Sequence, residues 1–351
     1  MHSLRHDLHG KCSNFAHIIQ VKRKINDHIT QRNATRGKHM TTRSTKTAKN
    51  KVNWLHRDWR LYVMLILPVA FYILFCYKPM VGVIIAFQKY NMFSKSLFQS
   101  PWIGLKNFEV AMKMPDFLPA LRNTIWLNVL GLVAGFPVPI VLAIMLNEMK
   151  SLRVKKVSQT LLYLPHFLSW IIIGGMVLQI FSQQTGIINS TLLKWGWIDK
   201  SIPFLSDGPH WQATYTLIGV WQGMGWGTIL YLSAIAGINM ELYEAAKIDG
   251  ANKMRQIWHV TLPGIRSTIV ILLILSIGQM MNISFDRPQV LGNPQVRDYC
   301  DVLSTFVYRI GIQNQKFARA TAVGLFQSVI GLILITGANF IAKRLGEEGI
   351  W

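Results

Sequence analysis

Runs of about 20 apolar residues, separated by short polar stretches, restrict the fold of this 351-residue chain more than any other feature. One helix needs about 20 such residues to cross a hydrocarbon core of ~30 Å. In lipid, each spanning segment must satisfy its own backbone hydrogen bonds, and a helix does so. The sequence therefore predicts an all-α membrane protein with six transmembrane helices. The six runs are residues 61–77, 124–146, 160–181, 213–238, 265–283 and 320–342.

Basic residues are concentrated before the first apolar run. Residues 1–60 contain 14 Lys and Arg but only 3 Asp and Glu, in a chain whose net charge is +21. Such a distribution is typical of a cytoplasmic N-terminus, and nothing else in this tail indicates a nucleic-acid partner. We interpret residues 1–53 as a disordered cytoplasmic tail and residues 54–351 as a six-span domain. The chain should be a multi-pass protein of the cell membrane, in contact with the lipid bilayer and with both termini in the cytoplasm.

The charges of the loops agree with this orientation at all but one place. Residues 149–158 form a compact basic loop, as expected on the cytoplasmic side. The last outside segment, residues 284–318, also contains several arginines. We therefore expect part of this segment to be buried in protein rather than to form a free loop.

A polar segment, residues 239–264, separates the fourth run from the fifth. It contains Glu244-Ala245-Ala246, then Gly250, and then Val260, any residue, Leu262 and Pro263. This pattern predicts a short helix, a break at glycine, a second short helix and a stop at proline. The small residues leave a surface that another protein can approach closely.

The 239–264 segment resembles the EAA loop of ABC importer permeases, with Val260 where isoleucine is usual. The likeness extends over residues 54–351 and includes WIGLKNF at 102–108 and DVLSTFVYR at 301–309. It is strongest to permeases of lipoprotein-dependent importers for oligosaccharides and polysaccharide fragments, which are common in Gram-positive bacteria. The resemblance implies the type I importer fold, with a cytoplasmic coupling loop between spans four and five. The function expected from it is carbohydrate uptake.

The resemblance also implies a set of partners. These are a second, homologous permease that makes a heterodimer, two ATPase subunits and an extracellular solute-binding lipoprotein. The sequence has no Gly-x-x-x-x-Gly-Lys-Ser/Thr loop, so we expect no cofactor on this chain and ATP hydrolysis by the partners. Cys12, Cys76 and Cys300 share no metal-ligand spacing, so no metal site is predicted.

The residues expected to couple the permease to the ATPase all lie in the 239–264 segment. Glu244 and Asp249 are five positions apart, about 140° around a helix, so one can contact the partner while the other holds the turn. Gly250 should permit the bend, and Pro263 should end the segment. The full set is Glu244, Ala245, Ala246, Asp249, Gly250, Val260, Leu262 and Pro263.

Candidates for the cargo path are aromatic, amide and acidic side chains of the fourth and fifth runs, because sugar rings combine apolar faces with hydroxyl groups. For the tryptophans, packing or contact with lipid is an alternative, and Asp286 can instead lie just outside the membrane beside Arg287. His166 is interpreted as a packing residue with its hydrogen bonds satisfied. The candidates are Trp221, Gln222, Trp226, Tyr231, Gln279, Asn282 and Asp286.

Two other functions remain open. One is a permease of the same type for another solute, such as a glycerophosphodiester or a polyamine. The other is a membrane-embedded transferase, which requires paired carboxylates or a Cys/His/Ser cluster at one membrane face. The sequence contains no such cluster, so we expect no catalytic residues and no enzyme activity.

Overall fold

The computed structural model describes residues 59–90, 100–347 and 349–350, in two units that divide after Phe71. The predicted tail, residues 1–53, lies outside the described residues. The described part of the first unit is α3 (Trp59–Phe71), an apolar helix that contains Pro68. The second unit holds every other described element.

Nearly all of the second unit is helical. Within the described residues, the only strand-like pairing is an isolated bridge between Gln88 and Trp102. The first elements are the π-helix Tyr72–Tyr77, α4 (Lys78–Met80), the 3-10 helix Val81–Phe87, α5 (Lys106–Met112), α6 (Phe117–Gly135), α7 (Pro137–Glu148), α8 (Leu152–Tyr163), the 3-10 helix Leu164–Phe167, α9 (Trp170–Phe181), α10 (Ile187–Lys194) and α11 (Gly208–Ala236). The remainder are α12 (Met240–Ile248), α13 (Lys253–Gln256), the π-helix Ile257–Thr261, α14 (Leu262–Gly264), α15 (Arg266–Gly278), α16 (Asp286–Leu291), the 3-10 helix Pro294–Val296, α17 (Arg297–Cys300), α18 (Leu303–Tyr308), the π-helix Arg309–Gln313 and α19 (Phe317–Arg344).

Several of these helices are long and apolar enough to cross a membrane. Among the described residues three segments meet this test, namely Trp59–Phe87, Phe117–Glu148 and Phe317–Arg344. Two bent helix pairs raise the number to as many as five if each pair is one span. The 29-residue α11 does not meet the test. The count of six spans therefore stays a prediction, whereas the all-helical fold class is confirmed.

The range 160–181 suggested one straight helix for the third apolar run, but the structure has two helices there. α8 and α9 meet at an angle of 101°. Pro165 lies in the 3-10 turn between them, where it removes a backbone donor and prevents the helix from continuing. Ser169 then caps α9, and its hydroxyl accepts a hydrogen bond from the amide of Ile172 at 3.3 Å. A second bend, of 60°, precedes α15, directly after Pro263 and Gly264.

The helices pack around three apolar clusters, and α11 takes part in two of them. Near its N-terminus, Trp211 is fully buried and its indole donates to the carbonyl of Leu291 at 2.7 Å. Near its C-terminus, Tyr231 and Ile235 pack with residues of α7 and α15. α11 therefore joins the two ends of the bundle, and it lies against α6 and α7 along the way.

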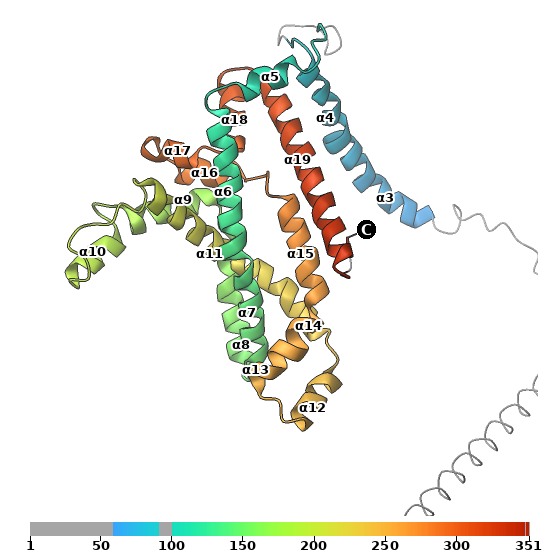
Figure 1. The fold of residues 1–351 in the computed structure, drawn as a ribbon, viewed down its shortest axis with the longest axis vertical. Helices are drawn as coiled ribbons and strands as arrows, with labels where there is room; N and C mark the ends of the chain where they lie inside the picture. Colours follow the sequence, from blue (N-terminus) through green and yellow to red (C-terminus); the bar gives the residue numbers. More distant parts are fainter. Residues whose placement is uncertain (1–58, 91–99, 348, 351) are drawn as a thin grey trace, which may run out of the picture. The chain divides into compact units, whose positions relative to one another are not determined.

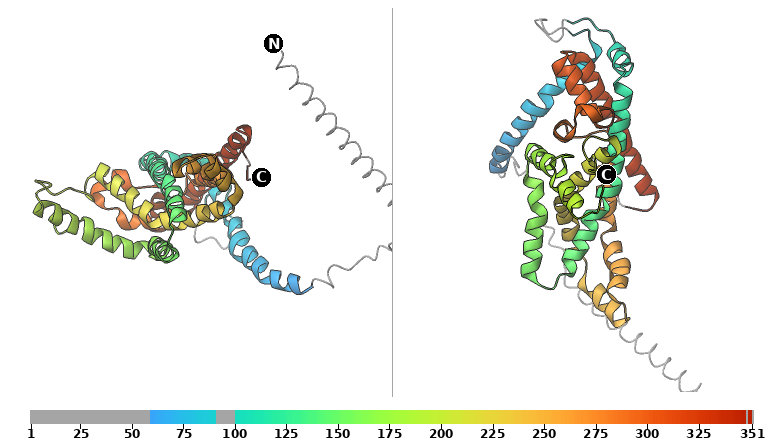
Figure 2. Two further views of the ribbon diagram at one scale, coloured as in Figure 1. Left: turned by 90° about the horizontal axis from the view of Figure 1, so that it is seen from below. Right: turned by 90° about the vertical axis from the view of Figure 1, so that its left-hand side faces the viewer.

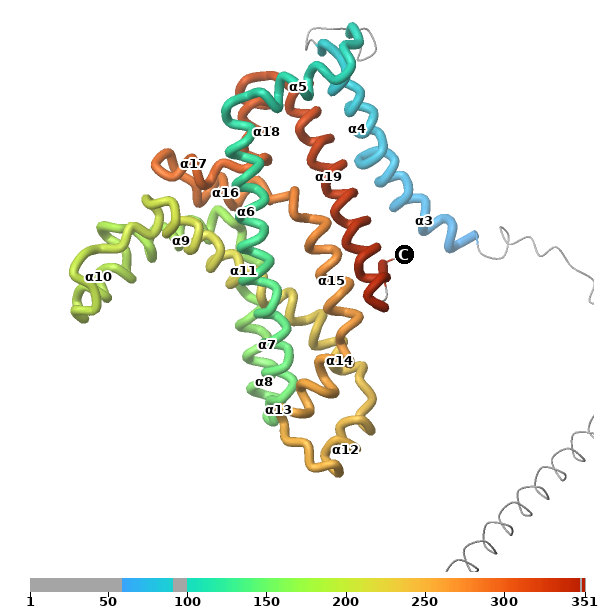
Figure 3. Tube along the Cα trace, viewed as in Figure 1, coloured from blue at the N-terminus to red at the C-terminus, as the bar shows by residue number. Residues whose placement is uncertain are grey.

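Much of the outside segment 284–318 is buried, as we expected from its charges. Val302, Leu303 and Phe306 are each at most 1% exposed. Leu303 and Phe306 belong to a cluster that also contains Phe117 of α6 and Val323 of α19. The 239–264 segment lies at the opposite end of this unit from α5 and α18 (Figures 1 and 2). α15 and α19 run side by side between the two ends (Figure 3).

Candidate functional site

The 239–264 segment begins with a well-capped helix. The side chain of Asn239 accepts a hydrogen bond from the amide of Glu241 at 3.0 Å, which satisfies one free donor at the start of α12. At the other end, the amide of Gly250 donates to the carbonyl of Lys247 at 3.0 Å. The amide of Ala251 donates to the carbonyl of Ala246 at 2.8 Å. These two bonds are those of a Schellman motif, in which the φ of Gly250 is +77°.

Three side-chain contacts hold the segment in its bent form. The hydroxyls of Tyr243 and Thr261 lie 2.9 Å apart and join α12 to the π-helix that precedes α14. The amide of Gln256 donates to the carbonyl of Ala251 at 2.9 Å. Lys253 forms an ion pair of 2.5 Å with Glu148 at the end of α7. The segment is therefore anchored to the helix bundle as well as to itself.

Its outer surface is unusually apolar for a charged segment. Ile248 is 86% exposed, and Met240 and Trp258 are each more than half exposed. Glu244 and Ala245 are exposed beside them. Large exposed apolar patches bordered by polar residues commonly mark protein–protein contacts.

The remaining predicted coupling residues occupy other positions in the same segment. Ala246, Val260 and Leu262 are each half-buried. Asp249 is the C-cap of α12, and its amide still donates to the carbonyl of Ala245 at 3.0 Å, so it keeps its helical position relative to Glu244. Pro263 is exposed in α14, one residue before the glycine that precedes the bend.

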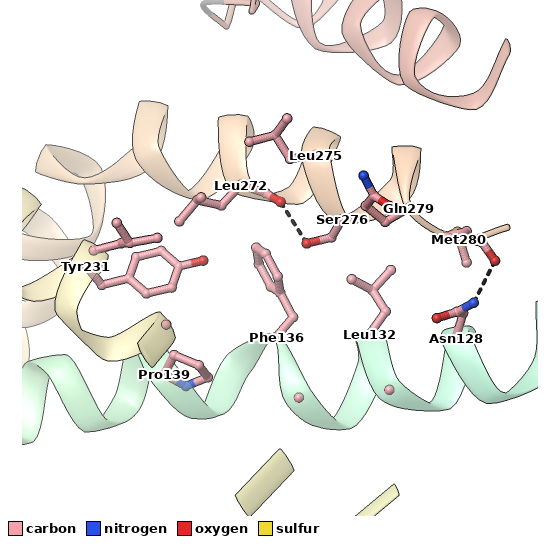
Figure 4. Close-up of a pocket in the computed structure, with 14 residues that line it drawn as sticks. Asn128, Leu132, Phe136, Pro139, Tyr231, Leu272, Leu275, Ser276, Gln279 and Met280 are labelled. Atoms are coloured by element: carbon pink, nitrogen blue, oxygen red, sulfur yellow. Dashed lines mark hydrogen bonds between the residues drawn. The ribbon is translucent and has the colours of Figure 1, made fainter. Parts of the chain in front are cut away.

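A cavity of about 470 Å³ lies between α6–α7, α11 and α15. Its wall is mostly apolar, with Leu132 and Phe136 on one side and Leu272 and Leu275 on the other (Figure 4). Polar groups gather at one end, where the amide of Asn128 donates to the carbonyl of Met280 at 2.7 Å. No Lys, Arg, Asp or Glu is among the described residues that line it.

Two of the predicted path residues, Tyr231 and Gln279, line this cavity together. Tyr231 packs edge-on against Phe136, with ring centroids 6.4 Å apart. Asn282 and Asp286 are exposed in the stretch that follows α15 and outside this wall. Asp286 forms no ion pair among the described residues, so the suggested pairing with Arg287 is absent there.

The other three candidates, Trp221, Gln222 and Trp226, contact the bend between α8 and α9 or the adjacent core. Trp221 packs against the apolar cluster around Trp211. Gln222 donates to the carbonyl of His166 at 3.4 Å. Trp226 stacks on the His166 ring at 4.9 Å. The Nδ1 atom of His166 is buried without a hydrogen-bond partner among the described residues, so our expectation that its bonds are satisfied was wrong.

The cavity also contains residues that the sequence analysis did not name. Asn128 and Ser276 are polar positions inside apolar runs, and this signal was available. Phe136 carried no such signal, because one aromatic ring among many in a span is not distinctive. Among the described residues, no group of three or more His, Cys, Asp or Glu is placed to hold a metal ion.

Paired charges hold the outside segment 284–318 against α6. Arg309 contacts the carboxylates of Asp301 at 2.7 Å and Asp116 at 3.0 Å. Burial alone lowers the pKa of Arg309, but its hydrogen bond and its attraction to Asp301, helped by Asp116, raise the pKa above its usual value. Arg297 is also within 3.4 Å of Asp116.

Comparisons with known proteins agree with this geometry. Residues 135–346 match the family described as binding-protein-dependent transport system inner membrane component. The chain is 41% identical to Protein LplB of Bacillus subtilis over 87% of this chain and 96% of that protein. It is 42% identical to the polygalacturonan/rhamnogalacturonan transport system permease protein YteP of the same organism, over 83% of this chain and 90% of that protein.

A solved structure of a bacterial ABC transporter involved in the import of the acidic polysaccharide alginate is also similar. One of its chains superimposes with a TM-score of 0.75 and 36% identity, covering 83% of this chain and 97% of that one. The predicted resemblance to ABC importer permeases is confirmed. Because the family match covers more than half of the sequence, this chain belongs to the inner-membrane components of binding-protein-dependent transport systems and has the type I ABC importer permease fold.

Proposed function

We propose that this chain forms part of the translocation path of an ATP-driven oligosaccharide importer and receives its driving force through the 239–264 segment. The observation that supports this most directly is the exposed apolar surface of α12 and its neighbours, around Ile248, on a segment tied to α7 by Lys253 and Glu148. An ATPase that binds this surface can transmit its closure to the bundle because the segment is anchored. Alternating access requires such a link between partner and path.

The cavity between α6–α7, α11 and α15 supports a sugar cargo. Apolar rings and leucines along its wall suit the C–H faces of a pyranose, and Asn128, Ser276 and Gln279 suit its hydroxyls. Its described lining residues include no cation, so this cavity suits the neutral parts of a cargo and offers no charge that would select a phosphate group. The relatives named for polygalacturonan and alginate also favour an oligosaccharide over another small solute.

A single chain of this fold encloses only part of a path, so we infer a complex. It consists of this chain, a second homologous permease, two ATPase subunits and an extracellular solute-binding lipoprotein, in the cell membrane of a Gram-positive bacterium, with both termini of this chain in the cytoplasm. The coupling contact involves Glu244, Ala245 and the exposed apolar residues around them. The cargo contacts are those of Tyr231 and Gln279, followed by Gln222 and Trp226.

Affinity capture of the tagged chain from its host in mild detergent tests this assignment. The wild type should retain an ATPase, a second permease and a solute-binding lipoprotein, identified by mass spectrometry. Ile248→Lys should lower the retained ATPase at least tenfold while the second permease stays bound, because it places a charge in an apolar contact. Leu152→Lys, at an exposed apolar residue outside the 239–264 segment, is the matched control and should leave all partners bound. Capture of the wild type without any ATPase would overturn the proposal.

A further inference from the structure

A second cavity, of about 700 Å³, lies at the outer end of the molecule between α6, α11 and α17. Arg122 and Trp126 line it from α6, and because they are four residues apart they lie on one face of that helix. Gln212 of α11 and Asp298 and Tyr299 of α17 complete the wall. None of these residues lines the cavity that contains Tyr231 and Gln279.

The wall of this outer cavity is held in place by hydrogen bonds. The indole of Trp126 donates to the side-chain oxygen of Gln212 at 3.1 Å, while the Trp126 ring remains 48% exposed. The buried amide of Asn123 donates to the carbonyls of Asp298 at 2.8 Å and Asp301 at 3.0 Å. A ring face and an amide group are therefore presented in fixed positions, which lowers the entropy lost when a ligand binds.

Arg122 contributes a positive charge that forms no ion pair among the described residues, although Asp298 also lines the cavity. Its guanidinium donates to the side-chain oxygen of Asn123 and to the carbonyl of Asp298, each at 3.3 Å, and forms no ion pair there. Arg297 and Arg309, in the same part of the molecule, both contact Asp116. Unlike Arg297 and Arg309, Arg122 forms no ion pair among the described residues, and it lies beside an exposed aromatic ring.

The outer cavity also begins a stripe along α11. Gln212, Gly219, Gly223 and Trp226 follow one another at intervals of seven, four and three residues, so they lie on one side of that helix. Over Gly219 lies the guanidinium of Arg287, which donates to the carbonyl of Tyr215. In the part of the chain that the structure describes, no atom lies within 4 Å of the position that a Cβ on Gly223 would occupy.

Arg287 is a second cation without a carboxylate partner among the described residues. Its guanidinium lies 3.6 Å from the centre of the Tyr215 ring and 5.2 Å from that of Trp170, and its Nε atom is buried without a hydrogen-bond partner. Aromatic faces stabilise such a cation but do not neutralise it. Two guanidiniums without an ion pair among the described residues therefore lie beside α11, Arg122 in the outer cavity with Gln212 and Arg287 over Gly219.

We propose that the outer cavity is a subsite for a carboxylate-bearing sugar ring, and hence that the cargo class is uronate oligosaccharides. The ring stacks on Trp126, its carboxylate binds Arg122, and its hydroxyls bind Gln212 and the carboxylate of Asp298. Arg287 offers the next positive charge inward along the stripe. This inference rests on the proposed function as an oligosaccharide importer and specifies its cargo.

The test uses the complete importer in phosphatidylcholine nanodiscs, without the solute-binding lipoprotein. The probes are tetramers of galacturonate, mannuronate and guluronate, each compared with its carboxyl-reduced, neutral counterpart by equilibrium dialysis. At least one uronate tetramer should bind more tightly than its neutral form. Arg122→Gln should weaken that binding about tenfold, as loss of a charge-assisted hydrogen bond does, and leave the neutral tetramer within twofold.

The aromatic platform gives an independent readout. Trp126→Leu should weaken binding of the charged and neutral tetramers alike, by about fivefold, because stacking does not depend on the carboxylate. Trp197→Leu, at another exposed tryptophan of the outer loops, is the control and should change neither. An equal effect of Arg122→Gln on both tetramers, or no effect on either, would overturn the subsite.

ATP-driven uptake in proteoliposomes with the lipoprotein distinguishes failure of this inference from failure of the proposed function. Uptake of neutral oligosaccharides without any preference for uronates contradicts this inference and leaves the proposed function standing. Absence of ATP-driven uptake of any saccharide contradicts both. The dialysis is repeated in nanodiscs that also contain phosphatidylglycerol, an anionic lipid. If Arg122→Gln changes uronate binding only in those nanodiscs, the cavity binds a lipid headgroup and the cargo assignment is wrong.

Discussion

Gly250 shows how one residue determines the shape of the candidate coupling surface. Its φ of +77° is a conformation that residues with a Cβ atom adopt at a free-energy cost. Apart from its chain neighbours, no described residue lies within 4 Å of the position that a Cβ would occupy, so the requirement comes from the backbone and not from space. The sequence pattern predicted a break here, and the two Schellman hydrogen bonds give its physical form.

Substitutions at Gly250 should therefore follow backbone preference. Gly250→Asn should retain most of the ATPase, because asparagine tolerates the left-handed conformation. Gly250→Ala should lower the amount of captured ATPase about fivefold, since a left-handed alanine costs about 1 kcal/mol. The measurement is the amount of ATPase captured with each variant, with the second permease as internal standard. Equal retention by both variants would show that the cap does not shape the contact.

At the scale of elements, the glycines of α11 explain how closely helices approach one another. A Cβ on Gly225 would meet the carbonyl of Leu162 at the end of α8, and one on Gly227 would lie 2.9 Å from Pro139 of α7. These two glycines therefore permit α7 and α8 to pack closely against α11. Gly223 has no such role, because no described residue lies within 4 Å of the position that its Cβ would occupy. Composition alone does not distinguish the two kinds of glycine.

This difference between the two glycines predicts opposite effects of the same substitution. Gly225→Ala should lower the thermal midpoint of the purified complex, because backbone atoms of α8 cannot move aside as a flexible side chain can. Gly223→Ala should leave the midpoint unchanged or raise it slightly, since alanine favours helix and meets no neighbour. Intrinsic fluorescence during heating in detergent measures both. A similar fall in both variants would mean that the space beside Gly223 is filled in the assembled importer.

The limits of sequence reasoning are also visible in particular elements. The apolar runs gave the helical class, and the spacing from Glu244 to Pro263 gave the 239–264 segment, because both are local patterns. The run 160–181 was expected to be a single span, and the bend of 101° depends on how Pro165 and Ser169 act together. The hydropathy of a run does not report such a break.

At the scale of the whole molecule, the sequence could not show which distant residues lie close together in the fold. Asn128 and Ser276 line one cavity although they are far apart in the chain, and no periodicity connects them. Likewise, Arg287 was considered beside Asp286, but its partners are the rings of Tyr215 and Trp170 and the carbonyl of Tyr215. Single residues were identified from chemistry, but their grouping required the tertiary structure.

The ion pair between Lys253 and Glu148 connects the 239–264 segment to α7, whose helix continues through α6 to the opposite end of the bundle. An exposed pair of this kind adds at most about 1 kcal/mol to folding. Under the proposed function, we infer that the pair transmits movement between the 239–264 segment and the bundle. Lys253→Glu and Glu148→Lys should each lower ATP-driven uptake about fivefold, through repulsion, while captured ATPase stays constant. The double exchange restores the attraction and should restore uptake, since neighbouring residues are not additive. The measurement is ATP-driven uptake in proteoliposomes. If the double variant takes up no more cargo than either single variant, force reaches the path by another route.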